Sequence, residues 1–407
     1  MRYAEALGVL RETALAQMTA VKAADQTELV SLTAARGRVC AKDILSQVDL
    51  PPFTNSAIDG FALTKDALAK GSMKVAGALY PGETPKSETP SGSVWEIMTG
   101  APVPLDAVAC VKIEDTKVDR EKGIVDFQPE AQLNDFFRLA GSDFAKGDLV
   151  LKAGDTIRPE NQMALASTGS STVEVKKKMR VLLIATGKEL VEPGRELKPG
   201  QIYNSTQVYL AEALKDFGCD VELGPTIADE PEVFARVLAK MDHDLLVTTG
   251  AVSMGQADFI PGELKAAGFN ILFHRLDIKP GRPLLFGTRG TTSVFGLPGN
   301  PVSGVVGLRF FIEAYLRTRL GRAPEQPLKL KLKSGYRKPK NLRAFLKAHL
   351  VSEAGDLRVE ISNGQPSHMI QSLTKSSVWA VLPEDSDSFE PESLVDVYFQ
   401  NSGSLNL

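Results

Sequence analysis

The chain has 407 residues, with 47 Lys and Arg against 50 Asp and Glu, which gives a formal net charge of -3 at pH 7. At roughly 150 residues per domain, this length predicts two to four domains. The content of 43% hydrophobic and 24% charged residues is typical of a globular protein and excludes a disordered or fibrous chain. Because the charge gives no global positive field, we expect neither a nucleic acid nor an anionic membrane as partner.

The chain lacks the patterns of export, membrane insertion and disulfide bonding. No apolar run approaches the ~20 residues that span a bilayer, and the charges of the first residues are interleaved with apolar ones, unlike a signal peptide. Cys40, Cys110 and Cys219 lie far apart without a CxxC pair, so neither a disulfide framework nor a zinc site is expected. These observations predict a soluble protein of the reducing cytoplasm with three buried thiols.

The first half of the chain predicts a helix followed by two small domains. Residues 1–22 have the spacing of one amphipathic helix that packs on the rest of the chain. Residues 48–140 predict an inserted β-rich domain, because short β-prone runs alternate with Pro and Gly. The flanking segments 23–47 and 141–177 predict a linking α+β domain with a helix that begins at Pro159, since proline is favoured in a first helical turn.

The second half predicts an α/β domain and a β domain. Over residues 178–322, strand-like and helix-like patterns alternate, which predicts a mostly parallel sheet covered by helices. Residues 323–407 contain short alternating runs that predict a smaller C-terminal β domain. The fold class is therefore multidomain, with a central α/β sheet domain, an inserted β-rich domain and a C-terminal β domain.

Four loops of the α/β region follow predicted strands, and ligands of open parallel sheets bind where such loops gather. Small residues in the loops let backbone N–H groups approach a phosphate, and the GLPGNPVS loop enters a long helix whose first N–H groups attract anions. The loop residues are Thr186, Gly187 and Glu189; Thr248, Thr249, Gly250, Ser253, Gly255 and Asp258; Pro298, Gly299, Asn300, Pro301 and Ser303; and Lys279 and Arg282, which supply cations.

Each of these signals also has an ordinary structural interpretation. The PGNPVS run is by itself more often a plain helix cap than an anion site. Asp229 precedes Glu230 and Pro231 and is an N-cap candidate about as readily as a metal ligand. TGA and ATG loops occur at many strand ends, so function and structure weigh about evenly there. The co-occurrence of these motifs in chain order favours function.

Taken together, the motifs resemble those of the molybdopterin molybdenumtransferases, the MoeA proteins and the gephyrin E domain. The resemblance covers nearly the whole chain and is carried by PPFTNSAIDGFAL (51–63), IMTGAPVPLDAVACVKIED (97–115), GSDFAKGD (141–148), ATGKEL, GQIYNS (200–205), TGAVSMGQADF, IKPGRP and GLPGNPVS. It implies a molybdopterin-binding type of α/β domain. It also implies that molybdate is inserted into adenylylated molybdopterin with Mg2+, releasing molybdenum cofactor and AMP.

The resemblance further implies an assembly and its partners. The expected assembly is an elongated homodimer, with the active site between the α/β domain of one chain and the β domain of the other. Further partners would be a molybdopterin adenylyltransferase and molybdoenzyme maturation factors.

The roles carried over follow the matching motifs. The catalytic residues implied are Asp59, Thr99, Glu189, Asp229, Asp258 and Lys279. Of these, Glu189, Asp229 and Asp258 are the expected Mg2+ ligands, since Mg2+ prefers oxygen ligands. The residues expected to bind pterin, phosphate or molybdate are Thr186, Gly187, Thr249, Gly250, Ser253, Arg282, Pro283, Pro298, Gly299, Asn300, Pro301, Ser303, Lys347 and Ser372. For Asp59 and Thr99, each followed by glycine, turn chemistry is the ordinary alternative.

Four positions depart from the family pattern. Lys188 stands where an acidic residue is usual, Arg282 where lysine is usual, Lys347 where arginine is usual, and Ala251 where glycine is usual. Two alternative functions follow. One is a catalytically impaired paralogue that acts as a dimeric pterin-binding or scaffold protein. The other is a molybdopterin adenylyltransferase, although those short proteins lack the inserted and C-terminal β domains.

Overall fold

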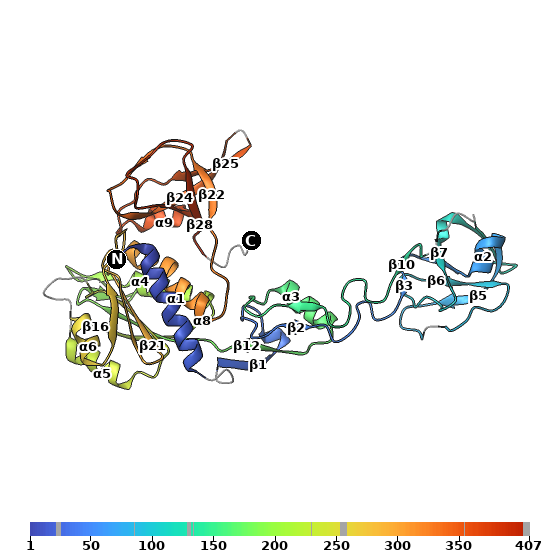
Figure 1. The fold of residues 1–407 in the computed structure, drawn as a ribbon, viewed down its shortest axis with the longest axis horizontal. Helices are drawn as coiled ribbons and strands as arrows, with labels where there is room; N and C mark the ends of the chain where they lie inside the picture. Colours follow the sequence, from blue (N-terminus) through green and yellow to red (C-terminus); the bar gives the residue numbers. More distant parts are fainter. Residues whose placement is uncertain are drawn as a thin grey trace. The chain divides into compact units, whose positions relative to one another are not determined.

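The computed structural model describes residues 1–21, 26–84, 86–127, 132, 134–228, 230–252, 259–353 and 355–401. The chain divides into two compact units (Figure 1): Leu29–Val175 forms one, and Met1–Glu28 together with Lys176–Leu407 forms the other. Among the described helices, none is both long and apolar enough to cross a lipid bilayer.

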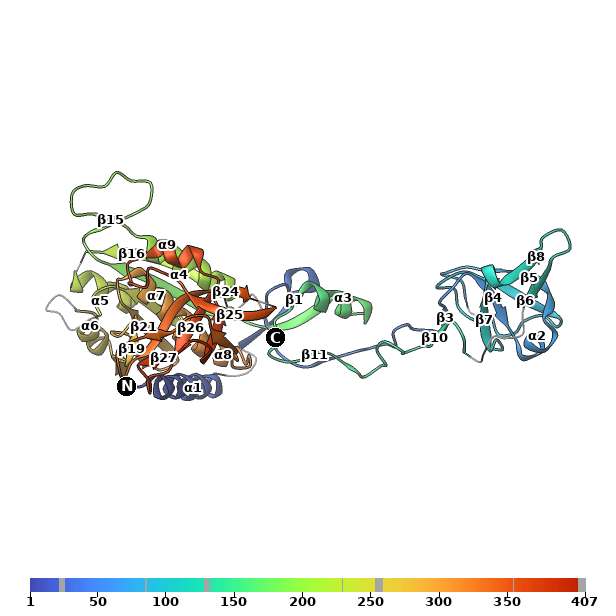
Figure 2. The ribbon, with the colours of Figure 1, turned by 90° about the horizontal axis from the view of Figure 1, so that it is seen from above.

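The Leu29–Val175 unit contains a six-stranded sheet in the order β7-β4-β6-β5-β9-β8 (Figure 2). Its neighbouring strands are antiparallel except for β5 and β6, which are parallel. Phe61, Leu63 and Val94 are buried in its core, and the short helix α2 begins after Thr64, whose hydroxyl accepts from the Ala67 N–H. The bounds are β4 Gly60–Leu63, α2 Lys65–Lys70, β5 Ser72–Leu79, β6 Ser93–Ile97, β7 Ala109–Lys112, β8 Thr116–Asp119 and β9 Ile124–Phe127.

The remainder of this unit consists of paired short strands and one helix. Helix α3, Pro159–Ser167, has Pro159 in its first turn, as the sequence predicts. A second core, with Cys40, Ile157 and Val173, lies beneath it. The strand pairs are β1 (Thr27–Ser31) with β12 (Thr172–Lys176), β2 (Ile44–Leu45) with β11 (Leu149–Leu151), and β3 (Asn55–Ser56) with β10 (Phe137–Arg138); a 3-10 turn covers Leu32–Ala34 and another Ile113–Asp115.

The predicted α/β sheet is present as six strands in the order β16-β13-β17-β21-β20-β18. Three neighbouring pairs are parallel, whereas β21 with β20 and β20 with β18 are antiparallel. The antiparallel side has a local cause: only Gly290 and Thr291 separate β20 from β21, and so short a link closes a hairpin but cannot form a parallel crossover. The bounds are β13 Arg180–Thr186, β16 Asp220–Ile227, β17 Leu245–Thr249, β18 Asn270–His274, β20 Leu285–Arg289 and β21 Thr292–Leu297.

Helices cover both faces of this sheet (Figure 1). Helices α5 and α6 bury Phe234, Leu238 and Leu264 against one face, and α1, α4, α7 and α8 lie on the other. The helix predicted at the start of the chain is α1, whose Gln17 side chain is buried and hydrogen-bonds Ser293. The bounds are α1 Tyr3–Ala20, α4 Ser205–Asp216, α5 Pro231–Lys240, α6 Ile260–Ala266, α7 Pro301–Gly307, a π-helical turn Leu308–Ile312 and α8 Glu313–Arg319; β14 is Leu190–Val191 and β15 is Ile202–Tyr203.

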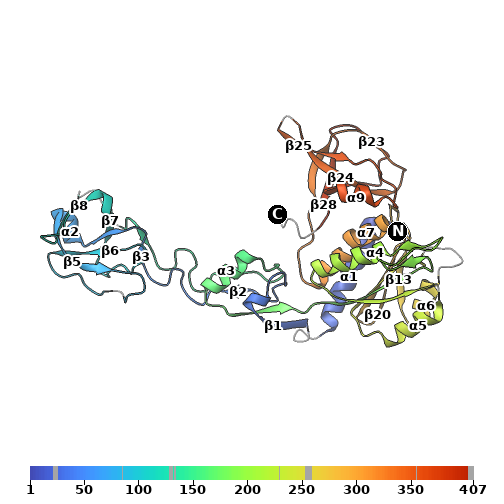
Figure 3. The same ribbon diagram turned by 180° about the vertical axis from the view of Figure 1, so that it is seen from behind.

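The C-terminal domain is a small closed sheet (Figure 3). Its strands follow the order β24-β25-β22-β28-β26, and β26 pairs again with β24. Strand β19, from the α/β region, extends the sheet by pairing in parallel with β24, so the 275–284 loop belongs to both domains. The bounds are β19 Ile278–Lys279, β22 Leu328–Leu332, β23 Tyr336–Arg337, β24 Arg343–Glu353, β25 Asp356–Ile361, α9 Ile370–Lys375, β26 Val378–Leu382, β27 Ser388–Phe389 and β28 Leu394–Phe399.

Candidate functional site

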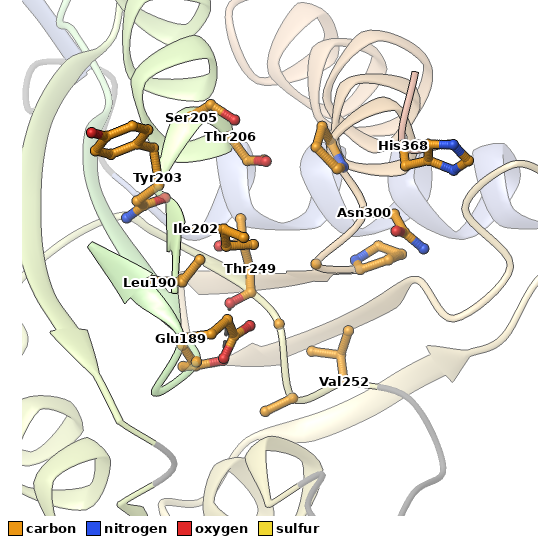
Figure 4. Close-up of a pocket in the computed structure, with 18 of the residues that line it drawn as sticks. Glu189, Leu190, Ile202, Tyr203, Ser205, Thr206, Thr249, Val252, Asn300 and His368 are labelled. Atoms are coloured by element: carbon orange, nitrogen blue, oxygen red, sulfur yellow. Dashed lines mark hydrogen bonds between the residues drawn. The ribbon is translucent and has the colours of Figure 1, made fainter. Parts of the chain in front are cut away.

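The carboxyl ends of the parallel strands border a cleft of about 800 Å³ (Figure 4). Strands β13, β17 and β21 end at Thr186, Thr249 and Leu297, and the loops that follow them line the cleft. This is the edge at which an open parallel sheet binds its ligands. The lining residues among the sequence-predicted set are Thr186, Gly187, Glu189, Thr249, Gly250, Pro283, Pro298, Gly299, Asn300 and Pro301.

The first two loops touch each other because Gly250 has no side chain. Its φ is +86°, and a Cβ at this position would lie 2.4 Å from the Thr186 carbonyl oxygen and 2.7 Å from its hydroxyl. The Thr186 hydroxyl also donates to the Thr249 carbonyl over 3.0 Å. A glycine at this point therefore sets the spacing between the β13 and β17 loops, which form the floor of the cleft.

Glu189 contributes a carboxylate to the cleft. Its side chain folds back over Gly187, because a Cβ built on Gly187 would lie 2.7 Å from Glu189 Oε1. The Glu189 carbonyl accepts from the Ile202 N–H over 2.9 Å, which joins this loop to β15. Within the described part of the chain, no group of three or more acidic, His or Cys residues could hold a metal ion.

Two of the three expected Mg2+ ligands, Asp229 and Asp258, lie outside the described residues, as does Ser253. Ala251, which lies shortly before Ser253 in the chain, has a φ of +47°. This is the left-handed region, in which a side chain carries strain. The neighbouring Val252 carbonyl is hydrogen-bonded to His274 Nε2, which holds the β17 loop against the end of β18.

The third loop enters helix α7, where Pro301 occupies the first turn. The helix cap is made by backbone atoms. The Asn300 side chain makes no capping bond, but the Asn300 backbone carbonyl accepts from the Gly304 N–H. The Val302 N–H donates to the Ser367 carbonyl over 3.0 Å. The first N–H groups of this helix were expected to attract an anion, but the Val302 N–H already has a hydrogen-bond partner within the protein.

A second cavity, of about 510 Å³, adjoins the cleft and shares Pro283, Pro298 and Asn300 with it. It is lined by Lys279, Arg282 and the buried Ser303, and by residues of the C-terminal domain. Arg282 Nη2 lies 3.9 Å from Asp277 Oδ1, and both side chains are partly exposed. Lys279 and Arg282 thus line a cavity beside the cleft, and not the cleft itself.

Lys347 and Ser372 line neither cavity among the residues that the structure describes. Lys347 is 1% exposed, and its ammonium donates to the carbonyls of Gly364, Pro366 and Met369. Burial lowers the pKa of this amine. The Ser372 hydroxyl is likewise occupied, over 2.6 Å, by the Gly364 carbonyl.

Asp59 and Thr99 belong to the Leu29–Val175 unit and contact each other. Asp59 Oδ1 accepts from the Thr99 N–H at 2.7 Å and from its hydroxyl at 2.9 Å. Both hydrogen bonds lower the pKa of the Asp59 carboxyl, and the bond from the Thr99 backbone N–H has the larger effect. Both residues are exposed, so this pair combines a turn interaction with a carboxylate that is kept ionised.

Several lining residues had no role assigned from the sequence. Leu190, Ile202, Tyr203, Ser205 and Thr206 surround one side of the cleft (Figure 4). Four of them belong to, or directly follow, the GQIYNS motif, so that motif was the available signal. His368 lies on the opposite side near Asn300. No local pattern indicated it, because it comes from a different domain.

Comparisons with known proteins agree with this architecture. Family models match residues 1–169 (MoeA N-terminal region, domain I and II), 182–318 (probable molybdopterin binding domain) and 329–399 (MoeA C-terminal region, domain IV). The molybdopterin molybdenumtransferase of Synechococcus elongatus is 36% identical over 385 residues, which cover 91% of this chain and 94% of that protein. That of Haemophilus influenzae is 32% identical over 378 residues, covering 88% and 90%.

A solved structure also shares the fold. The crystal structure of the molybdopterin biosynthesis MoeA protein from Pyrococcus horikoshii OT3 superposes with a TM-score of 0.81 at 27% identity, covering 98% of this chain and 99% of that one. The two named curated relatives match along 94% and 90% of their own length. The chain therefore belongs to the molybdopterin molybdenumtransferase (MoeA) family.

Proposed function

We propose that this chain completes molybdenum cofactor: it inserts molybdate into adenylylated molybdopterin with Mg2+ and releases AMP and the cofactor. The observation that supports this most is the likeness to molybdopterin molybdenumtransferases across 91% of the chain. The cleft at the carboxyl edge of the α/β sheet supports it independently, since it combines small residues, hydroxyls and one carboxylate. A pyrophosphate-linked substrate needs backbone approach and hydrogen-bond donors of this kind.

We assign the two cavities to different parts of the substrates. The 800 Å³ cleft would bind adenylylated molybdopterin, with Gly187 and Gly250 allowing close approach of the phosphates. The adjoining 510 Å³ cavity, with Lys279, Arg282 and Ser303, would receive molybdate. Cations beside a hydroxyl donor suit a tetrahedral dianion. Because the cavities share Pro283, Pro298 and Asn300, the oxyanion would lie next to the bound substrate.

We propose that Glu189 takes part in holding Mg2+, together with Asp229 and Asp258. A single described carboxylate in the cleft fits Mg2+, which is commonly bound by one or two carboxylates, substrate phosphates and waters. When bound, the ion would neutralise phosphate charge. Gly187 contributes by leaving room for the Glu189 carboxylate.

We further propose a cytoplasmic homodimer in which Asp59 and Thr99 of one chain complete the site of the other. The lowered pKa of Asp59 suits a carboxylate that stays charged during the reaction. The substrate would come from a molybdopterin adenylyltransferase, and the product would pass to molybdoenzyme maturation factors. Mixing Glu189→Gln chains with Asp59→Asn chains tests the shared site, because only heterodimers would regain one intact site.

The decisive experiment measures AMP release by the purified protein from adenylylated molybdopterin, in Mg2+, with and without molybdate. We expect release that depends on molybdate and falls in Glu189→Gln. Glu192→Gln is the matched control, because Glu192 is an exposed residue whose carboxylate pairs with Arg195 of the same loop. Substrate binding without AMP release would refute the transferase and favour a scaffold, and ATP consumption with molybdopterin would indicate an adenylyltransferase.

Lys188→Asp separates an active enzyme from an impaired paralogue. Lys188 is exposed and does not line the cleft among the described residues. We therefore expect the substitution to leave the rate of AMP release nearly unchanged. A large gain would mean that the native cleft is impaired by this lysine and would support the scaffold function.

A further inference from the structure

His368 is the basic side chain of the cleft. Among the described lining residues, no other Lys, Arg or His is present, and the only carboxylate is that of Glu189. His368 is exposed and lies beside Asn300, across the cleft from Tyr203 (Figure 4). Phosphate oxygens bind most strongly to charged or N–H donors. The imidazole is thus the described side chain that suits a phosphate group in this cleft.

Lys347 holds the segment that carries His368. This segment, residues 362–370, leads from β25 to α9. The Lys347 ammonium donates to the carbonyls of Gly364 at 2.6 Å, Met369 at 3.1 Å and Pro366 at 3.3 Å. An ammonium has three N–H donors, so each has a backbone partner on this segment. None is left to bind a substrate oxyanion directly.

Two further contacts fix the same segment. The Gln365 amide pairs with the Lys347 backbone, accepting from its N–H at 3.0 Å and donating to its carbonyl at 2.8 Å. The Ser372 hydroxyl lies within hydrogen-bonding distance of two of the carbonyls that Lys347 contacts, those of Gly364 and Met369. On the other side of the segment, the Ser367 carbonyl accepts from the Val302 N–H at the start of α7. His368 therefore follows a residue that is docked onto the α/β domain.

We propose that His368 binds a phosphate group of the substrate and that Lys347 is a positioning residue, which acts on the substrate only through the 362–370 segment. The inference rests on the proposed function for the identity of that substrate. It differs from the expectation that Lys347 contacts molybdate. It also explains why a buried cation is placed at this position without an acidic partner among the described residues: the carbonyls of a loop that must be held in one conformation satisfy it.

A double-mutant cycle tests the proposal in the full-length protein. We measure kcat and KM for adenylylated molybdopterin in the wild type, His368→Gln, Lys347→Met and the double variant. Loss of a charge-assisted hydrogen bond predicts a rise in KM of about tenfold in His368→Gln. Lys347→Met should raise KM by a similar factor, and the double variant by no more than either alone. His243→Gln, a histidine outside both cavities whose ring pairs with Glu222, is the control and should not change KM.

Multiplied effects in the double variant would overturn the positioning role, because they would mean that Lys347 acts on the substrate independently of His368. Should Lys347→Met not fold, Ser372→Ala replaces it in the cycle. This variant removes a contact to the same segment and keeps the buried cation paired. It predicts a smaller rise in KM that is likewise absent in the His368→Gln background.

Histidine NMR gives a readout that does not depend on turnover. The chain has four histidines, so the His368→Gln spectrum assigns the His368 ring signal. ADP, the adenosine diphosphate part of adenylylated molybdopterin, is titrated in the presence of Mg2+. We expect the His368 signal to shift in the wild type and to shift less in Lys347→Met. If ADP does not shift the His368 signal, the proposed phosphate-binding role of His368 is overturned, even if molybdate-dependent AMP release is observed. A shift without AMP release would instead refute only the proposed function.

Discussion

The contact between the β13 and β17 loops predicts a large difference between substitutions at two glycines with nearly the same φ. Gly250 and Gly200 have φ values of +86° and +85°. A Cβ at Gly200 would meet nothing within 4 Å, whereas one at Gly250 would lie 2.4 Å from the Thr186 carbonyl oxygen. Gly200→Ala therefore measures the cost of the left-handed conformation alone, which is about 1–2 kcal/mol.

Gly250→Ala adds a steric term to the same conformational cost. The clash is with a backbone atom of a buried strand end, so it cannot be relieved by turning a side chain, and overpacking of this kind costs about 1–3 kcal/mol. The expected loss of unfolding free energy is then about 2–5 kcal/mol in Gly250→Ala. The clash would push the β13 and β17 loops apart, and both loops line the cleft. AMP release should therefore fall in Gly250→Ala and not in Gly200→Ala.

Urea unfolding of both variants, followed by tryptophan fluorescence and by circular dichroism, measures the difference. Equal destabilisation of Gly250→Ala and Gly200→Ala would refute the reasoning, because it would mean that the β13 and β17 loops do not approach as closely as the structure places them. Normal AMP release by Gly250→Ala would separately refute the assignment of these loops to the substrate cleft.

Three further predictions follow from single contacts. Ala251→Gly should stabilise the protein by about 1 kcal/mol in urea unfolding, since it relieves a φ of +47°; lower stability would contradict strain there. Thr99→Val should raise the pKa of Asp59 part of the way toward its ordinary value in carboxyl NMR titrations, because it removes the hydroxyl bond and leaves the backbone bond, which lowers this pKa more; the stability gained from the hydroxyl bond is present above the ordinary carboxyl pKa and is lost as pH falls through the lowered one. Glu325→Gln should cost about 1.5–3 kcal/mol, since it removes the charge that the half-buried Glu325 presents to the buried Arg309, while Glu313 still pairs with that arginine; a loss below about 1 kcal/mol, the range of exposed pairs, would contradict this role.

The local features of the fold could be predicted because their causes are local. Pro159 and Pro301 mark the first turns of α3 and α7, since proline fits only that part of a helix. The strands that end at Thr186 and Thr249 are short apolar runs followed by glycine, and the edge of the sheet that they share follows from the alternation of strands and helices. This was enough to place ten of the predicted residues around one cleft.

The roles of the charged groups could not be read from the sequence. Substrate roles were expected for Lys279, Arg282 and Lys347. Lys347, however, is buried and donates to backbone carbonyls, and the other two line the neighbouring cavity. Whether a cation can bind a substrate depends on its burial and on whether acceptors within the protein already occupy its donors. Those acceptors lie on segments distant in sequence.

The sequence by itself determined the family, the order of the domains and the loops at the carboxyl edge of the sheet, because motifs and periodicity depend on neighbouring residues. Only the tertiary structure decided which side chains share the cleft. It brought His368 from the C-terminal domain to the loops after β13 and β17, and it used the Val302 amide to dock that domain. These outcomes depend on how the α/β and C-terminal domains pack through β19 and the 362–370 segment, a long-range arrangement that no local pattern encodes.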